Sequence, residues 1–157
     1  MNVNIVEKAN IIVRESKFAY IGFVDEEGFP MVSAISTVQP ENFRELYFTT
    51  GMRSKKAECF LHNSKASVCF RHEYNNITLI GEIENHTDQE TKSRFWKDFY
   101  IEFFPKGETD PDYCVLKFIT KRVILWIENE AAVFTVEELM TAQSRCGDVQ
   151  GVGGENL

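Results

Sequence analysis

Residues 18–39 read FAYIGFVDEEGFPMVSAISTVQ, and this stretch decides the fold class. Two runs rich in β-branched and aromatic residues, Phe18–Val24 and Met31–Gln39, flank the polar turn DEEG at 25–28. The glycine of this turn tolerates a positive φ, and the turn is too short for the helical crossover that parallel strands need. Pro30 is expected at the start of the second strand, where its missing N–H does little harm. The segment therefore predicts an antiparallel hairpin.

The rest of the chain predicts further antiparallel strands, together with helices that flank them. A third strand is expected at Leu46–Thr50, a second hairpin is formed by Ser67–Arg71 and Ile77–Glu84, and a long sixth strand, Tyr113–Glu128, is expected to bulge near residues 120–122. Helices are predicted at Val3–Glu15, at Lys55–Asn63, after the capping box Thr87–Glu90 (presenting Phe95, Trp96 and Phe99), and from the capping box Thr135–Glu138 to Arg145. This order predicts a mainly β protein, a small six-stranded antiparallel barrel with flanking helices.

Length and charge limit the classes of protein. The 157 residues predict one domain, 1–146, followed by a glycine-rich tail, 147–157, that we expect to be flexible. Seventeen basic against twenty-four acidic side chains give a net charge of −7, which disfavours nucleic acid and anionic membranes as partners. The sequence shows no membrane span or signal peptide, and its four scattered cysteines indicate ordinary thiols of a cytoplasmic protein rather than disulfides or a zinc site.

The segment YFTTGMRSKK at residues 47–56 carries the strongest chemical signal. A strand ends in two threonines, a glycine turn follows, and a helix begins at Ser54 with Lys55 and Lys56 behind it. Hydroxyls, backbone N–H groups and cations that converge at a helix start can bind a phosphate. The same pattern also suits a solvated basic helix start, so spacing alone leaves both interpretations open.

Three stretches of the chain together resemble one family. They are GFPMVSAI at 28–35, the segment from Tyr47 through Lys55 with Asn63 and Val68, and a C-terminal portion with Trp96, FPKG at 104–107, Asp110-Pro111 and Trp126. In this order they resemble the pyridoxamine-phosphate-oxidase-like superfamily of FMN-binding split β-barrels, and within it the general-stress-protein subgroup. The resemblance covers roughly residues 5 to 128 and implies a homodimer with FMN in a groove at the subunit interface.

The resemblance also implies which residues contact the flavin. Ser33, Ala34, Ile35 and Ser36 would run beside the isoalloxazine and ribityl chain, and Phe48 and Thr49 would line the flavin. Ser54 and Lys55 would hold the phosphate, with Lys55 as the main cation and Lys56 and Arg53 as weaker candidates. Asn76 would reach the flavin from the partner subunit. Trp126 has the size to pack against the ring, although its apolar neighbours also suit a core position.

The sequence differs from pyridoxamine-phosphate oxidase, the enzyme that gives the superfamily its name, at positions that this enzyme needs for its reaction. Ser33 and Val38 stand where that enzyme has an arginine and a lysine, and its arginine-and-histidine substrate motif has no counterpart after Trp126, so oxidation of vitamin B6 phosphates is not expected. We expect His62, His72 and His86 to be surface or structural residues, because no pair has metal-ligand spacing.

Two functions remain open at this point. One is an FMN-dependent oxidoreductase, with NADH or NADPH as electron donor and an unknown small acceptor, in which the flavin supplies the chemistry. The other is a flavin-binding stress protein without turnover. A groove that takes haem or a deazaflavin instead is a third interpretation.

Overall fold

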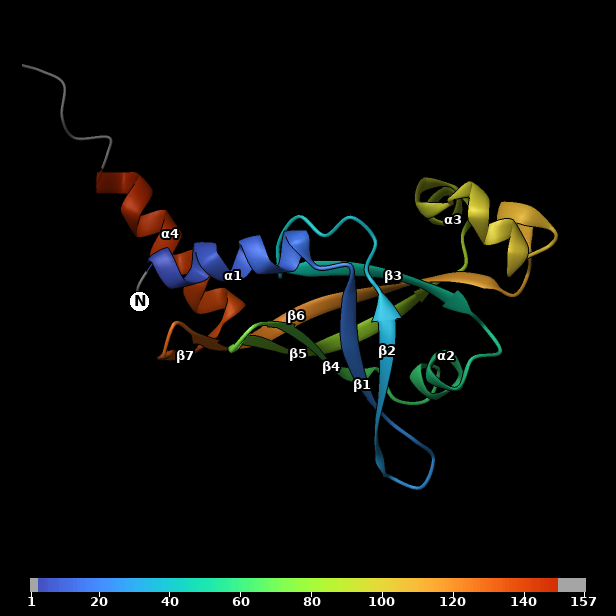
Figure 1. Ribbon diagram of the computed structural model, residues 1–157, viewed down its shortest axis with the longest axis horizontal. Helices are drawn as coiled ribbons and strands as arrows, with labels where there is room; N and C mark the ends of the chain where they lie inside the picture. The colour runs from blue at the N-terminus through green and yellow to red at the C-terminus, as the bar shows by residue number, and fades with distance from the viewer. Residues whose placement is uncertain (1–2, 150–157) are drawn as a thin grey trace, which may run out of the picture.

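The computed structural model describes residues 3–149 (Figure 1). Its elements, in chain order, are α1 Val3–Glu15, β1 Phe18–Val24, β2 Pro30–Ser36, β3 Glu45–Gly51, α2 Lys55–Phe60, β4 Lys65–His72, β5 Asn75–His86, α3 Gln89–Phe95, the 3-10 helices η1 Asp98–Glu102 and η2 Gly107–Thr109, β6 Tyr113–Ile127, β7 Glu130–Thr135 and α4 Val136–Val149. Within the described chain, no helix is long and apolar enough to cross a membrane.

The described strands form one antiparallel sheet with the order β2-β1-β4-β5-β6-β3, and β7 pairs with β6 beyond this path. The two ends of the path approach each other, because an isolated bridge joins Thr37, just after β2, to Phe48 of β3. In Figure 1 the C-terminal end of β2 meets β3, and the two strands then run apart. The sheet therefore curls toward a barrel that a single bridge closes.

Alternation along the strands creates the core. Every second residue of β1 is buried, and the same holds along β4 and the first part of β5, so one face of the sheet is apolar and is covered by α1, α2 and α4. A second, smaller cluster lies on the other face of β3 and β6, where Phe95, Tyr100 and Phe104 pack on Val38 and Tyr113. The segment from α3 to η2 is thus fixed to the sheet by aromatic contacts.

The predicted irregularity in the long strand is confirmed. Ile80 pairs with Arg122 and Gly81 with Thr120, so Lys121 is the extra residue of a β-bulge. A Cβ on Gly81 would lie 2.0 Å from the carbonyl oxygen of Ile119, which explains why glycine stands opposite the bulge.

The prediction of six strands was one short. Glu128 and Asn129 have φ angles of 50° and 65°, which gives a tight hairpin turn, and β7 follows directly and pairs with β6. The predicted turn at 25–28 is confirmed, with Gly28 at φ 85°.

Helix ends differ in detail from the prediction. Asp88, not Thr87, caps α3, because the Asp88 carboxylate accepts from the Thr91 N–H at 3.0 Å. The helix α2 ends at Phe60 rather than Asn63, and Trp96 and Phe99 follow α3 instead of belonging to it. Residues 147–149 of the predicted tail continue α4, and residues 150–157 lie outside the described residues.

Candidate functional site

The corner between β3 and α2 is built as the sequence predicts. The Ser54 side chain accepts from the Ala57 N–H at 3.3 Å and so caps α2, and the Thr50 hydroxyl lies 3.1 Å from the Ser54 hydroxyl. Since α2 has only six residues and Ser54 already satisfies one of its N–H groups, the helix end alone is a weak anion site. Any strong attraction for a phosphate must come from the cations around it.

A neighbouring loop holds the turn before α2 in place. The Met52 N–H donates to the Asp112 carbonyl at 2.6 Å, and the Arg53 N–H and Nε both donate to the Asp112 carboxylate, at 3.0 and 3.2 Å. Gly51 lies close to this contact, and a Cβ there would lie 2.9 Å from an Asp112 carboxylate oxygen, so a larger residue would require the Asp112 side chain to shift. The Arg53 charge is therefore neutralised by Asp112, which disfavours Arg53 as a phosphate ligand.

The two lysines of the corner have different surroundings. Lys55 is exposed, and its Nζ lies 2.8 Å from both carboxylate oxygens of Glu26, in the β1–β2 turn. This hydrogen bond raises the pKa of Lys55 and lowers the pKa of Glu26. Lys56 is half-buried and makes no hydrogen bond or ion pair with any described residue, and burial lowers its pKa. The corner therefore contains one neutralised and one unneutralised ammonium group.

The predicted β2 residues lie along one edge of the unpaired gap between β2 and β3, which we call the seam. β2 pairs with β1, β3 pairs with β6, and the only described bridge between β2 and β3 is the one from Thr37 to Phe48. Beyond the bridge, Ser33–Ser36 of β2 form one edge of the seam. Thr49 of β3 and then the corner at Ser54–Lys56 form the other edge. Backbone groups at these two edges have no ladder partner. The ion pair between Glu26 and Lys55 joins the far ends of the seam.

The side chains along the seam point in different directions. Ile35 is buried on the core face with Ser33 beside it, whereas Ala34 and Ser36 are on the exposed face. Phe48 is fully buried, so only its backbone can contact a ligand. The Thr49 hydroxyl lies on the opposite side of β3 and donates to the Tyr100 hydroxyl at 3.1 Å.

Two predicted residues lie together but far from this corner. Asn76 and Trp126 are directly paired between β5 and β6, on the exposed face of the sheet, and Trp126 is 40% exposed rather than buried in the core. Asn76 also pairs with Arg71 on β4, beside the start of β1, whereas Lys55 contacts the turn at the other end of β1. Within one chain, Asn76 and Trp126 are therefore separated from the cationic corner by the length of β1.

The histidines and cysteines add no second centre. His86 lies between Glu84 and Asp88, at 3.1 and 3.3 Å, and His62 and His72 are exposed. Cys59, Cys69 and Cys114 are free thiols, and the surroundings of the Cys146 side chain lie outside the described part. Over the described ranges, no group of three or more His, Cys, Asp or Glu side chains could hold a metal ion.

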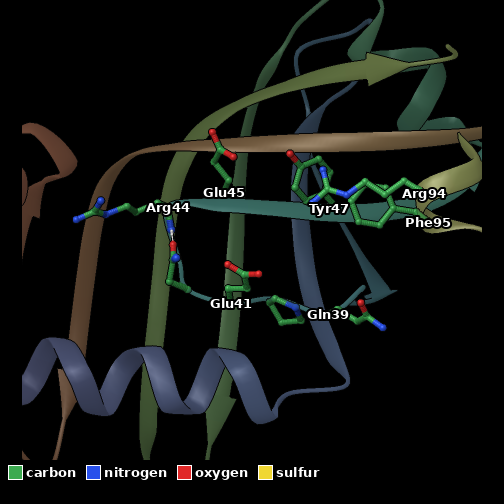
Figure 2. Close-up of a pocket in the computed structure, with 9 residues that line it drawn as sticks. Gln39, Glu41, Arg44, Glu45, Tyr47, Arg94 and Phe95 are labelled. Atoms are coloured by element: carbon green, nitrogen blue, oxygen red, sulfur yellow. Dashed lines mark hydrogen bonds between the residues drawn. The ribbon is translucent and has the colours of Figure 1, made fainter. Parts of the chain in front are cut away.

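A groove of about 530 Å³ lies elsewhere on the molecule, between the loop before β3 and the end of α3 (Figure 2). Arg94 and Phe95 form one wall, and the other is formed by Tyr47 and by residues 39–42, 44 and 45. None of the residues predicted from the sequence lines it. No motif in the sequence indicates this groove, because its walls come from segments about 50 residues apart that tertiary packing brings together.

One antiparallel sheet, curled until a single bridge joins its ends and flanked by helices, defines a split β-barrel. The chain belongs to the pyridoxamine 5′-phosphate oxidase-like family, whose model matches residues 5–146. The family and the fold class inferred from the sequence are thus confirmed. No curated protein sequence matches the chain.

Solved structures of similar proteins have the same fold. One is a Clostridium acetobutylicum protein described as related to general stress protein 26 of B. subtilis, with 23% identity, a TM-score of 0.79, and coverage of 88% of this chain and 99% of that one. General stress protein 26 of Bacillus anthracis has 19% identity, a TM-score of 0.70, and coverage of 87% and 100%. A heme-binding protein of Mycobacterium smegmatis has 15% identity, a TM-score of 0.66, and coverage of 84% and 58%.

Proposed function

We propose that the chain binds FMN along the seam between β2 and β3 and acts as an FMN-dependent oxidoreductase. The observation that carries the proposal is the seam itself, two unpaired strand edges that lead to a hydroxyl-lined corner with an unneutralised, half-buried Lys56. Free backbone edges suit the polar edge of a flavin and its ribityl chain, and a desolvated cation suits a terminal phosphate. When bound, the flavin would supply the hydride or electron transfer.

Within this proposal, Lys56 is the main phosphate ligand and Lys55 is secondary. The sequence resemblance ranks the two lysines the other way, but Lys55 already interacts with Glu26 at 2.8 Å. A phosphate would have to compete with that carboxylate for Lys55, whereas Lys56 has no described partner to give up. Ser54 and Thr50 would add hydroxyl contacts, and Ser33–Ser36 and Thr49 would contact the flavin mainly through the backbone.

We propose that a second copy of the chain completes the site. Apolar side chains gather on the exposed face of the sheet, and the members of this set are Phe18, Tyr20, Val32, Trp126 and Val133. An exposed apolar sheet face of this kind is typical of a protein interface. A partner packed on it would bring its own Asn76 and Trp126 toward the seam, which one chain alone cannot do.

The free thiols of Cys59, Cys69 and Cys114 support a cytoplasmic location.

Haem is the second candidate ligand, because the Mycobacterium smegmatis protein of the same fold binds heme. The strand residues of the seam nearest the bridge, Ser33–Ser36 and Thr49–Gly51, include no histidine, cysteine or methionine to ligate an iron ion, which favours FMN over haem. A flavin-binding protein without turnover is the second candidate function, because these residues also offer no carboxylate or imidazole as a proton donor.

An anaerobic spectral titration tests the proposal. Purified protein is titrated with FMN, and NADH or NADPH is then added while the flavin absorbance is followed. We expect saturable FMN uptake and bleaching of the flavin band by a reduced nicotinamide. Uptake without bleaching by either nucleotide would favour the protein without turnover, and uptake of haemin but not FMN would overturn the flavin assignment.

A further inference from the structure

The groove of Figure 2 is a separate site, on the side of β3 that carries Tyr47. Its volume of about 530 Å³ is within the range of small-molecule pockets. Four charged side chains line it: Arg44 and Arg94, and Glu41 and Glu45. The lining is therefore neutral in sum, with both signs of charge exposed to the same space.

Arg94 is held in a fixed position on an aromatic platform. The rings of Tyr47 and Phe95 are stacked, with centroids 4.5 Å apart, and the guanidinium carbon of Arg94 lies 5.4 and 4.8 Å from their centroids. Cation–π contact of this kind orients the guanidinium but leaves its N–H edge free. Arg94 makes no ion pair or hydrogen bond with any described residue.

The opposite wall is a loop fixed by hydrogen bonds rather than by secondary structure. The Phe43 N–H donates to Asn10 Oδ1 at 3.2 Å, the Arg44 N–H donates to Asn42 Oδ1 at 2.8 Å, and the Thr120 N–H donates to the Arg44 carbonyl at 2.9 Å. Phe43 itself is buried in the core. The part of the loop that directly follows Glu41 is therefore held in place.

The other two charges of the groove already have partners. Arg44 donates to the Gln143 side chain, and Glu45 lies 3.7 Å from the Nζ of Lys117. Glu41, like Arg94, has no ion pair or hydrogen bond with a described residue. Figure 2 shows Glu41 on the loop below β3 and Arg94 at the α3 end of the groove. Arg94 and Glu41, on separate walls, are thus the two charged side chains of the groove with neither a hydrogen bond nor an ion pair to a described residue.

We propose that this groove binds a small zwitterion, an amino acid in the chemical sense, with its carboxylate on Arg94 and its ammonium group at Glu41. A planar guanidinium matches a carboxylate through two parallel N–H donors. A simple anion would satisfy Arg94 but approach two glutamates, and a simple cation would meet Glu41 but approach two arginines. Only a ligand that carries both charges satisfies both walls. This site is independent of the proposed flavin seam.

Isothermal titration calorimetry on the purified full-length protein tests the proposal. The probes are glycine, 4-aminobutanoate and 6-aminohexanoate, which place the two charges at increasing separation. Each is compared with its N-acetyl derivative, which keeps only the negative charge, and with its amide, which keeps only the positive charge. We expect one chain length to bind best, and both of its singly charged derivatives to bind about tenfold or more weakly.

Matched variants assign the two walls. Arg94→Gln should weaken the best zwitterion about tenfold or more and leave the amide unaffected, and Glu41→Gln should weaken the zwitterion similarly and leave the N-acetyl derivative unaffected. Arg14→Gln is the control, because Arg14 is exposed on α1 and pairs with Glu7, outside the groove. All three side chains are exposed, so folding should be intact by circular dichroism. Absence of binding by every probe, equal binding of the N-acetyl derivatives, or an equal loss in Arg14→Gln would each overturn the proposal.

Discussion

Replacement of Lys56 by methionine separates the phosphate contact from every other part of the proposed site. Methionine keeps much of the chain length and removes the charge. Lys56 is half-buried and has no described partner. A bound phosphate would therefore accept a charge-assisted hydrogen bond from the Lys56 ammonium group, and such a bond contributes about 1.5–3 kcal/mol. Lys56→Met should therefore weaken FMN binding by about tenfold to 150-fold. Lys55→Met should cost less, about 1 kcal/mol or under, because Lys55 is exposed and paired with Glu26.

Fluorescence titration at fixed ionic strength measures this ranking, with riboflavin as the matched ligand that lacks a phosphate. Riboflavin affinity should be the same in the parent protein and in Lys56→Met. If riboflavin loses as much affinity as FMN, the substitution acts through the structure and the phosphate assignment fails. If Lys55→Met has the larger effect, the order of the two lysines is that of the sequence resemblance, and the argument from ion pairing is wrong.

The stability of the ligand-free protein supplies an independent check on Lys56. Burial lowers its pKa below the ordinary value of 10.5, so the unfolded chain binds this proton more tightly than the folded one. The free energy of unfolding should therefore gain a contribution from Lys56 as the pH rises through its folded pKa toward 10.5. Urea denaturation of parent and Lys56→Met across alkaline pH should show this gain in the parent only. Equal pH profiles would mean that Lys56 is not desolvated.

Three further predictions concern the interface, the bulge and a buried thiol. Val32→Lys on the exposed sheet face should yield a monomer by light scattering, whereas Ile101→Lys, an exposed apolar residue of η1, should not; a dimeric Val32→Lys protein would contradict the proposed interface. Gly81→Ala should lower the free energy of unfolding by about 1–3 kcal/mol in urea titrations, because its Cβ would clash with the Ile119 carbonyl, and an unchanged midpoint would mean that the bulge adapts. Burial raises the pKa of Cys114 from 9.0 to about 12, so the unfolded thiol ionises first and stability should fall as pH rises from about 9 toward 12, a fall that Cys114→Ala should reduce.

Local signals in the sequence predicted the local features of the fold well. Thr135 and Glu138 form the predicted capping box, with reciprocal hydrogen bonds of 2.7 and 3.1 Å, and Ser54 caps α2 as expected. Both outcomes depend on residues within a few positions of each other. The missing strand β7 depends on pairing with β6 and on the left-handed conformation of Glu128 and Asn129, which the polar sequence there signals only weakly.

The candidate site depends on contacts between distant parts of the chain, which the sequence alone does not show. The motif at 47–56 predicts Lys55 and Lys56 as candidate phosphate ligands, but the order in which we rank them depends on Glu26, which lies 29 residues before Lys55 in the β1–β2 turn. Likewise, the side chain of Phe48 is excluded from ligand contact by core packing that no short motif encodes. No local pattern around Arg94 indicates its aromatic support, which depends on the contact of α3 with Tyr47 in a distant strand.

The position of the Thr37–Phe48 bridge gives these observations a common physical basis. A sheet that paired fully along β2 and β3 would satisfy its own backbone and leave no polar edge for a ligand. Because pairing stops after one bridge, the unpaired edges must be satisfied by water, by side chains or by a ligand that lies along the seam. A short ligand would satisfy only part of this length, whereas a ligand with a polar chain and an anionic end can run from the bridge to Lys56. The split in the barrel thus favours an elongated phosphorylated ligand, and sealing it with further β2–β3 pairs should remove flavin binding while leaving the rest of the sheet intact.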